Sequence, residues 1–172
     1  MTRVAVTLTI ADPAAMERLG ALLASQVRAG DAVLLTGELG AGKTTLTRGL
    51  GAALGVRGTV ASPTFVLART HLSLTGPPLV HVDAYRLRDA AELDDLDLDF
   101  TGSIVVVEWG AGMLEHLVDN WLAVTIDRPR GAGADVDEAH EPDAAPVEPR
   151  TVTIEGIGGR WADLGWLHAA RD

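Results

Sequence analysis

A glycine-rich stretch, Gly37 to Thr44, matches the phosphate-binding pattern G-x-x-x-x-G-K-[ST] in full. In such a loop, consecutive backbone N–H groups point at phosphate oxygens, and the N-terminus of the following helix adds partial positive charge. The ammonium group of Lys43 is expected to bridge the β- and γ-phosphates, and the Thr44 hydroxyl to bind Mg²⁺. Thr45, one residue further on, is placed to reach the α-phosphate. The expected phosphate-binding residues are Gly37, Glu38, Leu39, Gly40, Ala41, Gly42, Lys43, Thr44 and Thr45.

Lys43 is the single lysine of the chain, against 13 arginines. An ammonium is a compact point charge, whereas a guanidinium is a wide planar fork. A ring of backbone amides shaped around a phosphate suits the former. The one lysine therefore stands where an arginine would fit poorly, and Lys43 is the first candidate catalytic residue.

Two further candidate catalytic residues are carboxylates, each at the end of an apolar segment. Asp83 ends Leu79-Val80-His81-Val82-Asp83, and Glu108 ends Ile104-Val105-Val106-Val107-Glu108. Enzymes with a phosphate loop hold Mg²⁺, or water bound to it, with such strand-end acids. Glu108 is the better metal ligand because its strand is wholly apolar, whereas Asp83 fits a supporting role or the orientation of the attacking water. Either acid, taken alone, also fits a solvated strand end or a helix cap.

Two polar segments are candidates for sensing the nucleotide or meeting a partner. Along the predicted strand, His81, Asp83 and Tyr85 alternate and so face one side, with Arg86 following. A core histidine, an edge aromatic and an ion pair from Arg86 to the acids after Asp89 would explain the same row. The turn containing Ser62, Thr64 and Phe65 lies where nucleotide switches sense the γ-phosphate, although Ser-Pro-Thr is also an ordinary turn.

Periodicity and turn residues predict a single α/β domain, residues 1–172, with a mixed sheet of parallel central strands, antiparallel edge strands and helices on both faces. Asp12-Pro13 begins a helix to about Arg28, and Lys43 to Leu54 forms another that ends at Gly55. Strands are expected at 4–10, 31–36, 65–70, 79–85 and 104–108, and partly helical segments at 89–100 and 110–118. Segments 121–128 and 150–157 are expected to pair as an antiparallel hairpin.

Composition excludes several classes of protein. The chain has no cysteine, and its five histidines show no helical ligand spacing, which argues against disulfides and a zinc site. No apolar run approaches the roughly 18 residues that span a bilayer, and Thr7, Thr9 and Asp12 interrupt the start as a signal peptide. A cytoplasmic protein without a membrane partner is expected.

The formal net charge of −10 is concentrated in one segment, 131–149, which carries six acids and no Lys or Arg. Its three prolines and one-signed charge predict a disordered loop. The rest of the chain is still mildly acidic, so it lacks the basic face that grips nucleic-acid phosphates. Any RNA must be held by a partner.

Four motifs occur together, in order and at family spacing: GELGAGKTTLTRGL (37–50), SPTF (62–65), HVDAYRL (81–87) and VEWG (107–110). Their combination resembles the bacterial TsaE family, also called YjeE, over roughly residues 5–128. The resemblance implies a small P-loop ATPase that binds ATP and Mg²⁺. It further implies that the protein acts with TsaB and TsaD to form N6-threonylcarbamoyladenosine in tRNA next to the anticodon, so that tRNA is met only through the complex.

By position, the resemblance places Thr44 and Glu108 on Mg²⁺ and Asp83 near the γ-phosphate, with Ser62, Thr64 and Phe65 in a switch-like loop. It makes Tyr85, Arg86 and Trp109 switch-positioning or partner-facing residues.

Two other functions are alternatives to this one. A free-standing small-molecule kinase needs an arginine-bearing lid, but the long segment 131–149 has no arginine. A regulatory GTPase needs an Asn-Lys-x-Asp motif, which a chain with only Asn120 and Lys43 cannot contain.

Overall fold

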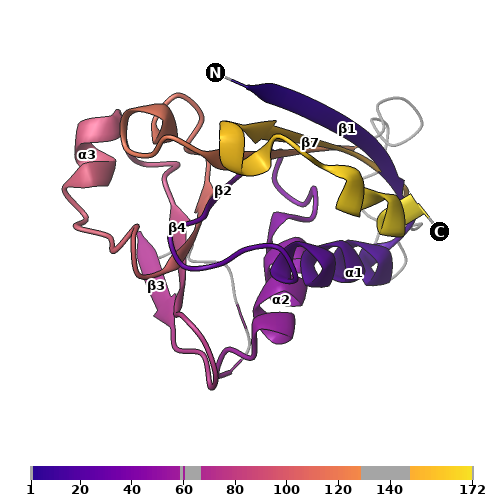
Figure 1. Ribbon diagram of the computed structural model, residues 1–172, viewed down its shortest axis with the longest axis horizontal. Coiled ribbons are helices and arrows are strands. Elements are labelled where there is room, and N and C mark those ends of the chain that lie inside the picture. The colour runs from indigo at the N-terminus through magenta and orange to yellow at the C-terminus, as the bar shows by residue number, and fades with distance from the viewer. Residues whose placement is uncertain (1, 59, 61–66, 129–147, 172) are drawn as a thin grey trace, which may run out of the picture.

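The protein was examined as a computed structural model that describes residues 2–58, 60, 67–128 and 148–171. Within these residues, seven strands form one sheet in the order β1-β7-β6-β2-β5-β4-β3 (Figure 1). The strands are β1 (Arg3–Ile10), β2 (Ala32–Gly37), β3 (Ala68–His71), β4 (Leu79–Asp83), β5 (Ile104–Glu108), β6 (Trp121–Asp127) and β7 (Arg150–Ile157).

The four central strands, β6, β2, β5 and β4, run parallel to one another. β3 pairs antiparallel with β4 at one edge, and β7 and β1 add two antiparallel strands at the other. The predicted class, a mixed α/β sheet with antiparallel edges, is confirmed. Because parallel strands share a direction, the C-terminal ends of β2, β4, β5 and β6 meet along one edge of the sheet.

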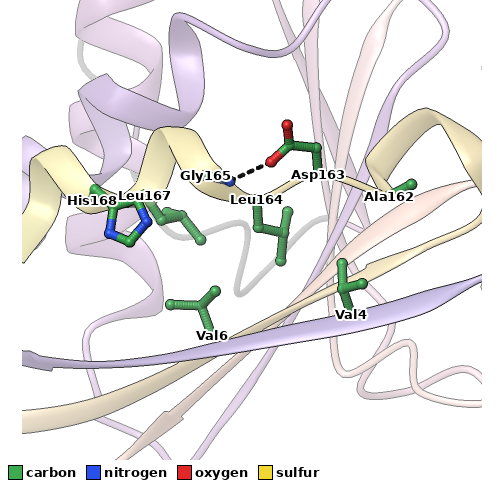
Figure 2. Close-up of a pocket in the computed structure, with 8 residues that line it drawn as sticks. All are labelled: Val4, Val6, Ala162, Asp163, Leu164, Gly165, Leu167 and His168. Atoms are coloured by element: carbon green, nitrogen blue, oxygen red, sulfur yellow. Dashed lines mark hydrogen bonds between the residues drawn. The ribbon is translucent and has the colours of Figure 1, made fainter.

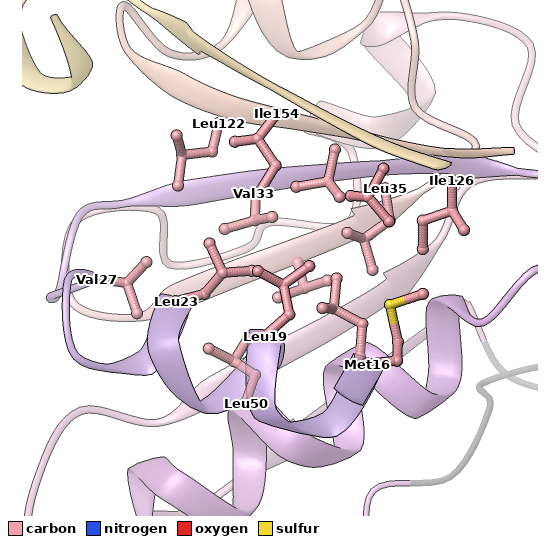
Figure 3. Close-up of a cluster of buried hydrophobic side chains, with 14 of the residues drawn as sticks. Met16, Leu19, Leu23, Val27, Val33, Leu35, Leu50, Leu122, Ile126 and Ile154 are labelled. Atoms are coloured by element: carbon pink, nitrogen blue, oxygen red, sulfur yellow. The ribbon is translucent and has the colours of Figure 1, made fainter. Parts of the chain in front are cut away.

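Helices cover both faces of the sheet. On one face lie α1 (Pro13–Ala24) and α2 (Lys43–Leu54), packed against each other (Figures 1 and 3). A Cβ on Gly49 would overlap the backbone of Glu17, so this close helix contact requires glycine. On the other face lie α3 (Ala90–Asp94) and the 3₁₀ turn η1 (Leu114–His116). Two further 3₁₀ turns, η3 (Gly159–Trp161) and η4 (Gly165–Arg171), follow β7.

Alternation along the strands divides the core into two clusters. On β2, Val33 and Leu35 pack with α1 and α2, as Figure 3 shows for the first cluster, whereas Leu34 joins the cluster under α3. Both sides of β5 are buried, as its run of consecutive apolar residues predicts. The sheet is therefore a rigid, doubly covered platform whose strand ends can position a site.

The local signals for helix ends are confirmed. The Asp12 carboxylate accepts a hydrogen bond from the Ala15 N–H at 2.7 Å and caps α1. Gly55 ends α2 in the left-handed region with φ 75°. The C-terminal end of α1 differs from expectation: the helix ends at Ala24 rather than near Arg28, and Ser25 is its C-cap.

Two of the expected elements are shorter in the structure. The strand predicted over 79–85 ends at Asp83, so Tyr85 does not continue its alternation. The segment 110–118 forms only the 3₁₀ turn η1. Of the strand predicted over 65–70, residues 65 and 66 lie outside the described residues, and the described part forms β3. Leu79 to Asp83 is as long as its partner β5, and pairing ends where β5 ends.

Some expectations fall on residues that the structure does not describe. These are Ser62, Thr64 and Phe65 of the switch-like turn and residues 131–147 of the acidic segment. In the described part of the chain, no cluster of three or more potential metal-ligating His, Asp or Glu side chains is present. The same residues contain no helix long and apolar enough to cross a bilayer.

Candidate nucleotide-binding site

The loop between β2 and α2 lies at the sheet edge where the central strands end. Gly37, the last residue of β2, pairs with Ile126 of β6, and a Cβ at Gly37 would lie 2.8 Å from the Ile126 carbonyl oxygen. Gly42 has φ 123°, a conformation that other residues rarely adopt, and no side chain caps α2 after it. The first N–H groups of α2 therefore remain available for an anion, as the sequence motif predicts.

Lys43 bends back across its own loop. Its ammonium Nζ donates to the carbonyl oxygens of Gly37 at 2.6 Å and Glu38 at 3.1 Å. The same atom lies 4.7 Å from the centre of the Trp109 ring, a cation–π contact. Burial lowers the pKa of Lys43, and the negative charges of Glu108 and Asp83 oppose that shift. The lysine is thus a partly desolvated cation held over the glycine loop and within the field of two carboxylates.

Asp83 and Glu108 are brought side by side by the sheet. They form a register pair at the ends of β4 and β5, and Glu108 is also opposite Leu35 of β2, two residues before the loop. Glu108 is buried, at 5 % exposure, and its Oε2 lies 2.7 Å from Nε2 of His81. Asp83 is half-buried, and its Oδ1 accepts a hydrogen bond from the Tyr85 N–H at 3.0 Å. The predicted proximity of both acids to the loop is present.

An aromatic pair borders the carboxylates. Trp109 follows Glu108 with φ 62°, in the left-handed region, and its backbone N–H donates to the Leu35 carbonyl at 3.3 Å. The edge of Tyr85 meets the Trp109 ring at a centroid distance of 5.5 Å, and Tyr85 is 70 % exposed. This backbone conformation turns the indole over Lys43. Trp109 therefore belongs to the site, with Tyr85 at its outer rim.

Arg86 is not part of this arrangement. Its side chain is exposed, and the ion pair to the following acids is made by Arg88, whose Nε lies 3.8 Å from Oε1 of Glu92. Thr44 and Thr45 are half-buried at the start of α2. Among the described residues, neither threonine hydroxyl has a hydrogen-bond partner, so both are available to a ligand.

Two arginines that the sequence did not single out also reach the loop. Arg150, which begins β7, donates from Nε to the Ala41 carbonyl at 3.1 Å. Burial lowers the pKa of Arg150; the charge of Arg128 adds to that shift and the charge of Glu148 opposes it. Arg128, after β6, has a guanidinium nitrogen 3.6 Å from where a Cβ on Gly40 would lie. No signal in the sequence placed them there, because it requires β6 beside β2 and β7 beside β6.

The donor set fits a nucleotide and Mg²⁺. The glycine loop carries the phosphate-binding pattern, and Lys43 adds a positive charge beside it. Hydroxyl and carboxylate oxygens, which Thr44, Asp83 and Glu108 provide, are the ligands that Mg²⁺ prefers. No cysteine or cluster of imidazoles competes with this chemistry among the described residues.

A hollow lies away from this edge, between β1 and the segment from Ala162 to His168, which includes the start of η4 (Figure 2). Its volume is about 250 Å³, and β1 is three strands from β2 in the sheet order. Most of its lining is aliphatic, and the Asp163 carboxylate is occupied by the Gly165 N–H at 2.7 Å. The hollow contributes nothing to the candidate nucleotide site.

Comparison with known proteins decides the family. The family model described as "Threonylcarbamoyl adenosine biosynthesis protein TsaE" matches residues 10–134. The chain belongs to the TsaE family. A TsaE protein of Streptomyces coelicolor is 56 % identical over 151 residues, covering 86 % of this chain and 94 % of that protein. The TsaE protein of Bacillus subtilis is 33 % identical over 154 residues, covering 89 % and 87 %.

A solved structure agrees with the TsaE assignment. The crystal structure of Bacillus subtilis YdiB superimposes with a TM-score of 0.71 and 26 % sequence identity, covering 99 % of this chain and 96 % of that one. The matched TsaE relatives are named as tRNA threonylcarbamoyladenosine biosynthesis proteins. The resemblance that the four sequence motifs indicated is therefore confirmed over most of the chain.

Proposed function

We propose that this TsaE-family chain is a magnesium-dependent ATPase that acts with TsaB and TsaD in forming N6-threonylcarbamoyladenosine in tRNA next to the anticodon. The observation that carries the proposal is the convergence of Lys43, Asp83 and Glu108 at one edge of the sheet, beside a complete phosphate loop. The formal net charge of −10 agrees with a protein that meets tRNA only through its partners. A protein that acts on tRNA in this way is expected to work in the cytoplasm.

The roles of the loop residues follow from their geometry. Backbone N–H groups of Gly37 to Thr45 would bind phosphate oxygens, as expected for this loop and the start of α2. Lys43 would exchange its two carbonyl acceptors for β- and γ-phosphate oxygens, which are stronger acceptors because they are charged. The catalytic contribution of Lys43 would be to stabilise the negative charge that develops on the transferring phosphoryl group.

Magnesium would be held by the Thr44 hydroxyl together with carboxylate oxygen from Glu108, and would neutralise phosphate charge when bound. Because Oε2 of Glu108 is engaged by His81, Oε1 is the oxygen left for this role. Asp83, the more exposed acid, would bind water near the γ-phosphate. Trp109 would exclude solvent from the ammonium side of the loop.

The proposal is tested by measuring ATP hydrolysis, monitored as phosphate release, with and without TsaB and TsaD. The expected result is slow hydrolysis by the chain alone and faster hydrolysis with both partners and Mg²⁺. Lys43→Ala and Glu108→Ala should fold and lose this activity. Fast hydrolysis that ignores the partners would contradict the dependent role. Phosphate transfer to a metabolite without partners would instead support the kinase.

A further inference from the structure

The pair formed by His81 and Glu108 is a deeply buried polar contact beside the candidate site. Their side chains are 0 % and 6 % exposed, and Nε2 of His81 lies 2.7 Å from Oε2 of Glu108. The histidine interrupts an otherwise apolar strand: Leu79, Val80 and Val82 around it are at most 4 % exposed. An aliphatic side chain would fill this core position without burying polar nitrogens. We therefore attribute the presence of a histidine at this core position to its contact with Glu108.

The sheet register determines on which side of the carboxylates His81 lies. Asp83 pairs with Glu108 at the strand ends, and His81 pairs with Val106, one pleat further from the loop. Side chains two residues apart face the same side of a strand. His81 thus lies under the two carboxylates on the side away from the phosphate loop. From that position it can hold Glu108 without contacting a nucleotide.

The hydrogen bond leaves the two oxygens of Glu108 unequal. An ionised carboxylate only accepts hydrogen bonds, so the imidazole donates from Nε2. The other ring nitrogen, Nδ1, is buried and has no hydrogen-bond partner among the described residues. Among the described residues, the hydrogen-bond partner of the His81 imidazole is therefore Glu108. Oε2 is turned into the core, and Oε1 remains free of His81.

We propose that His81 is a positioning residue that orients the Glu108 carboxylate for Mg²⁺ and the nucleotide phosphates. This inference rests on the proposed nucleotide function. Glu108 already acts electrostatically on Lys43, so its orientation bears on the charge balance of the site. Hydrogen bonds to a metal-ligating group from outside the coordination sphere typically change metal affinity or activity by about 10- to 100-fold.

The test measures how strongly Mg²⁺ enhances binding of a fluorescent ADP analogue, alongside the melting temperature. His81→Leu removes the donor, and His81→Asn places an amide too far back along the side chain to reach Glu108. His81→Gln places an N–H near the position of Nε2. The matched control is Ser103→Ala, a substitution at another buried polar residue, 2 % exposed, just before the opposite end of β5.

We expect the Mg²⁺ concentration at half effect to rise about tenfold in His81→Leu and His81→Asn, with metal-free binding unchanged. His81→Gln should restore most of the wild-type value, and Ser103→Ala should match wild type. In a Glu108→Gln background, His81→Asn should add no further rise, because the carboxylate through which His81 acts on Mg²⁺ is already absent. If His81→Leu does not fold, the Asn and Gln variants make the same comparison.

A merely structural histidine would lower the melting temperature of these variants and leave the Mg²⁺ dependence at the wild-type value, which would overturn the inference. Equal effects of His81→Gln and His81→Asn, or additive effects with Glu108→Gln, would overturn it as well. A wild-type protein without Mg²⁺-dependent nucleotide binding would overturn both this inference and the proposed function. Wild-type binding with no difference between the His81 variants and Ser103→Ala would overturn the inference alone.

Discussion

Lys43→Arg keeps the charge of the phosphate loop but changes its shape. The Lys43 ammonium lies 2.6 Å and 3.1 Å from two loop carbonyls and 4.7 Å from the Trp109 ring centre, and the residue is 6 % exposed. A planar guanidinium is wider than an ammonium and presents a fork rather than a point. Between the loop backbone and the indole, it must shift outward or displace Trp109.

The cost of that shift follows from Coulomb's law. Moving a unit charge from about 3 Å to about 5 Å from a phosphate oxygen, at an effective dielectric constant of about 20, loses roughly 2 kcal/mol. That loss corresponds to roughly thirtyfold in rate. Removing a preorganised charge-stabilising donor outright costs about 10²- to 10³-fold. Lys43→Arg should therefore hydrolyse ATP about thirtyfold more slowly than wild type and only roughly 3- to 30-fold faster than Lys43→Ala.

Replacing Lys43 should impair ATP hydrolysis but should not destabilise the nucleotide-free protein. Burial lowers the pKa of Lys43 below its ordinary 10.5 in the folded protein. Protonated Lys43 therefore opposes folding below both pKa values, and this penalty disappears as the pH rises above the unfolded value. The nucleotide-free Lys43→Met protein should melt at or above the wild-type temperature at pH 7, with the difference shrinking toward pH 10.5.

Thermal melting with and without Mg²⁺ and ATP, combined with steady-state phosphate release, measures both effects. Wild type should gain melting temperature with nucleotide, whereas Lys43→Met should gain little. Near-wild-type hydrolysis by Lys43→Arg would refute the view that this loop needs a compact cation. A large loss of nucleotide-free stability in Lys43→Met would show that the lysine supports the fold rather than the ligand.

Three other substitutions test the surroundings of the loop. Gly37→Ala should lower the free energy of unfolding by about 1–3 kcal/mol and weaken nucleotide binding, because the new Cβ would lie 2.8 Å from the Ile126 carbonyl oxygen; urea unfolding and ADP titration measure both. Arg150→Gln should raise the dissociation constant for ADP several-fold, because it frees the Ala41 carbonyl, and should change the melting temperature by no more than about 4 °C. Calorimetric titration measures the affinity, and an affinity equal to wild type would exclude this contact from nucleotide binding. Tyr85→Ala should change the free energy of unfolding by at most about 1.5 kcal/mol, because its ring contact with Trp109 lies at an exposed rim, yet weaken stimulation by TsaB and TsaD; full stimulation would place the partners elsewhere.

Elements defined by local chemistry were predictable from the sequence. The loop and helix from Gly37 to Leu54, the Asp12 cap and the Gly55 helix end depend on neighbours within a few residues, and all three are present. The apolar runs before Asp83 and Glu108 likewise predicted two buried strands ending in acids. Strand lengths were less predictable, as Tyr85 shows, because a strand ends where its partner ends.

The sequence by itself determined that this chain carries the phosphate-binding pattern, two strand-end carboxylates and a family-specific set of motifs. Residue types at fixed spacing suffice for that, because a phosphate loop is built from consecutive backbone groups. Only the tertiary structure decided that Arg150 touches the loop, that Trp109 covers Lys43, and that His81 holds Glu108. These contacts join residues 27 to 109 positions apart in the chain. They depend on strand order and register, which are set by packing across the whole sheet rather than by any local pattern.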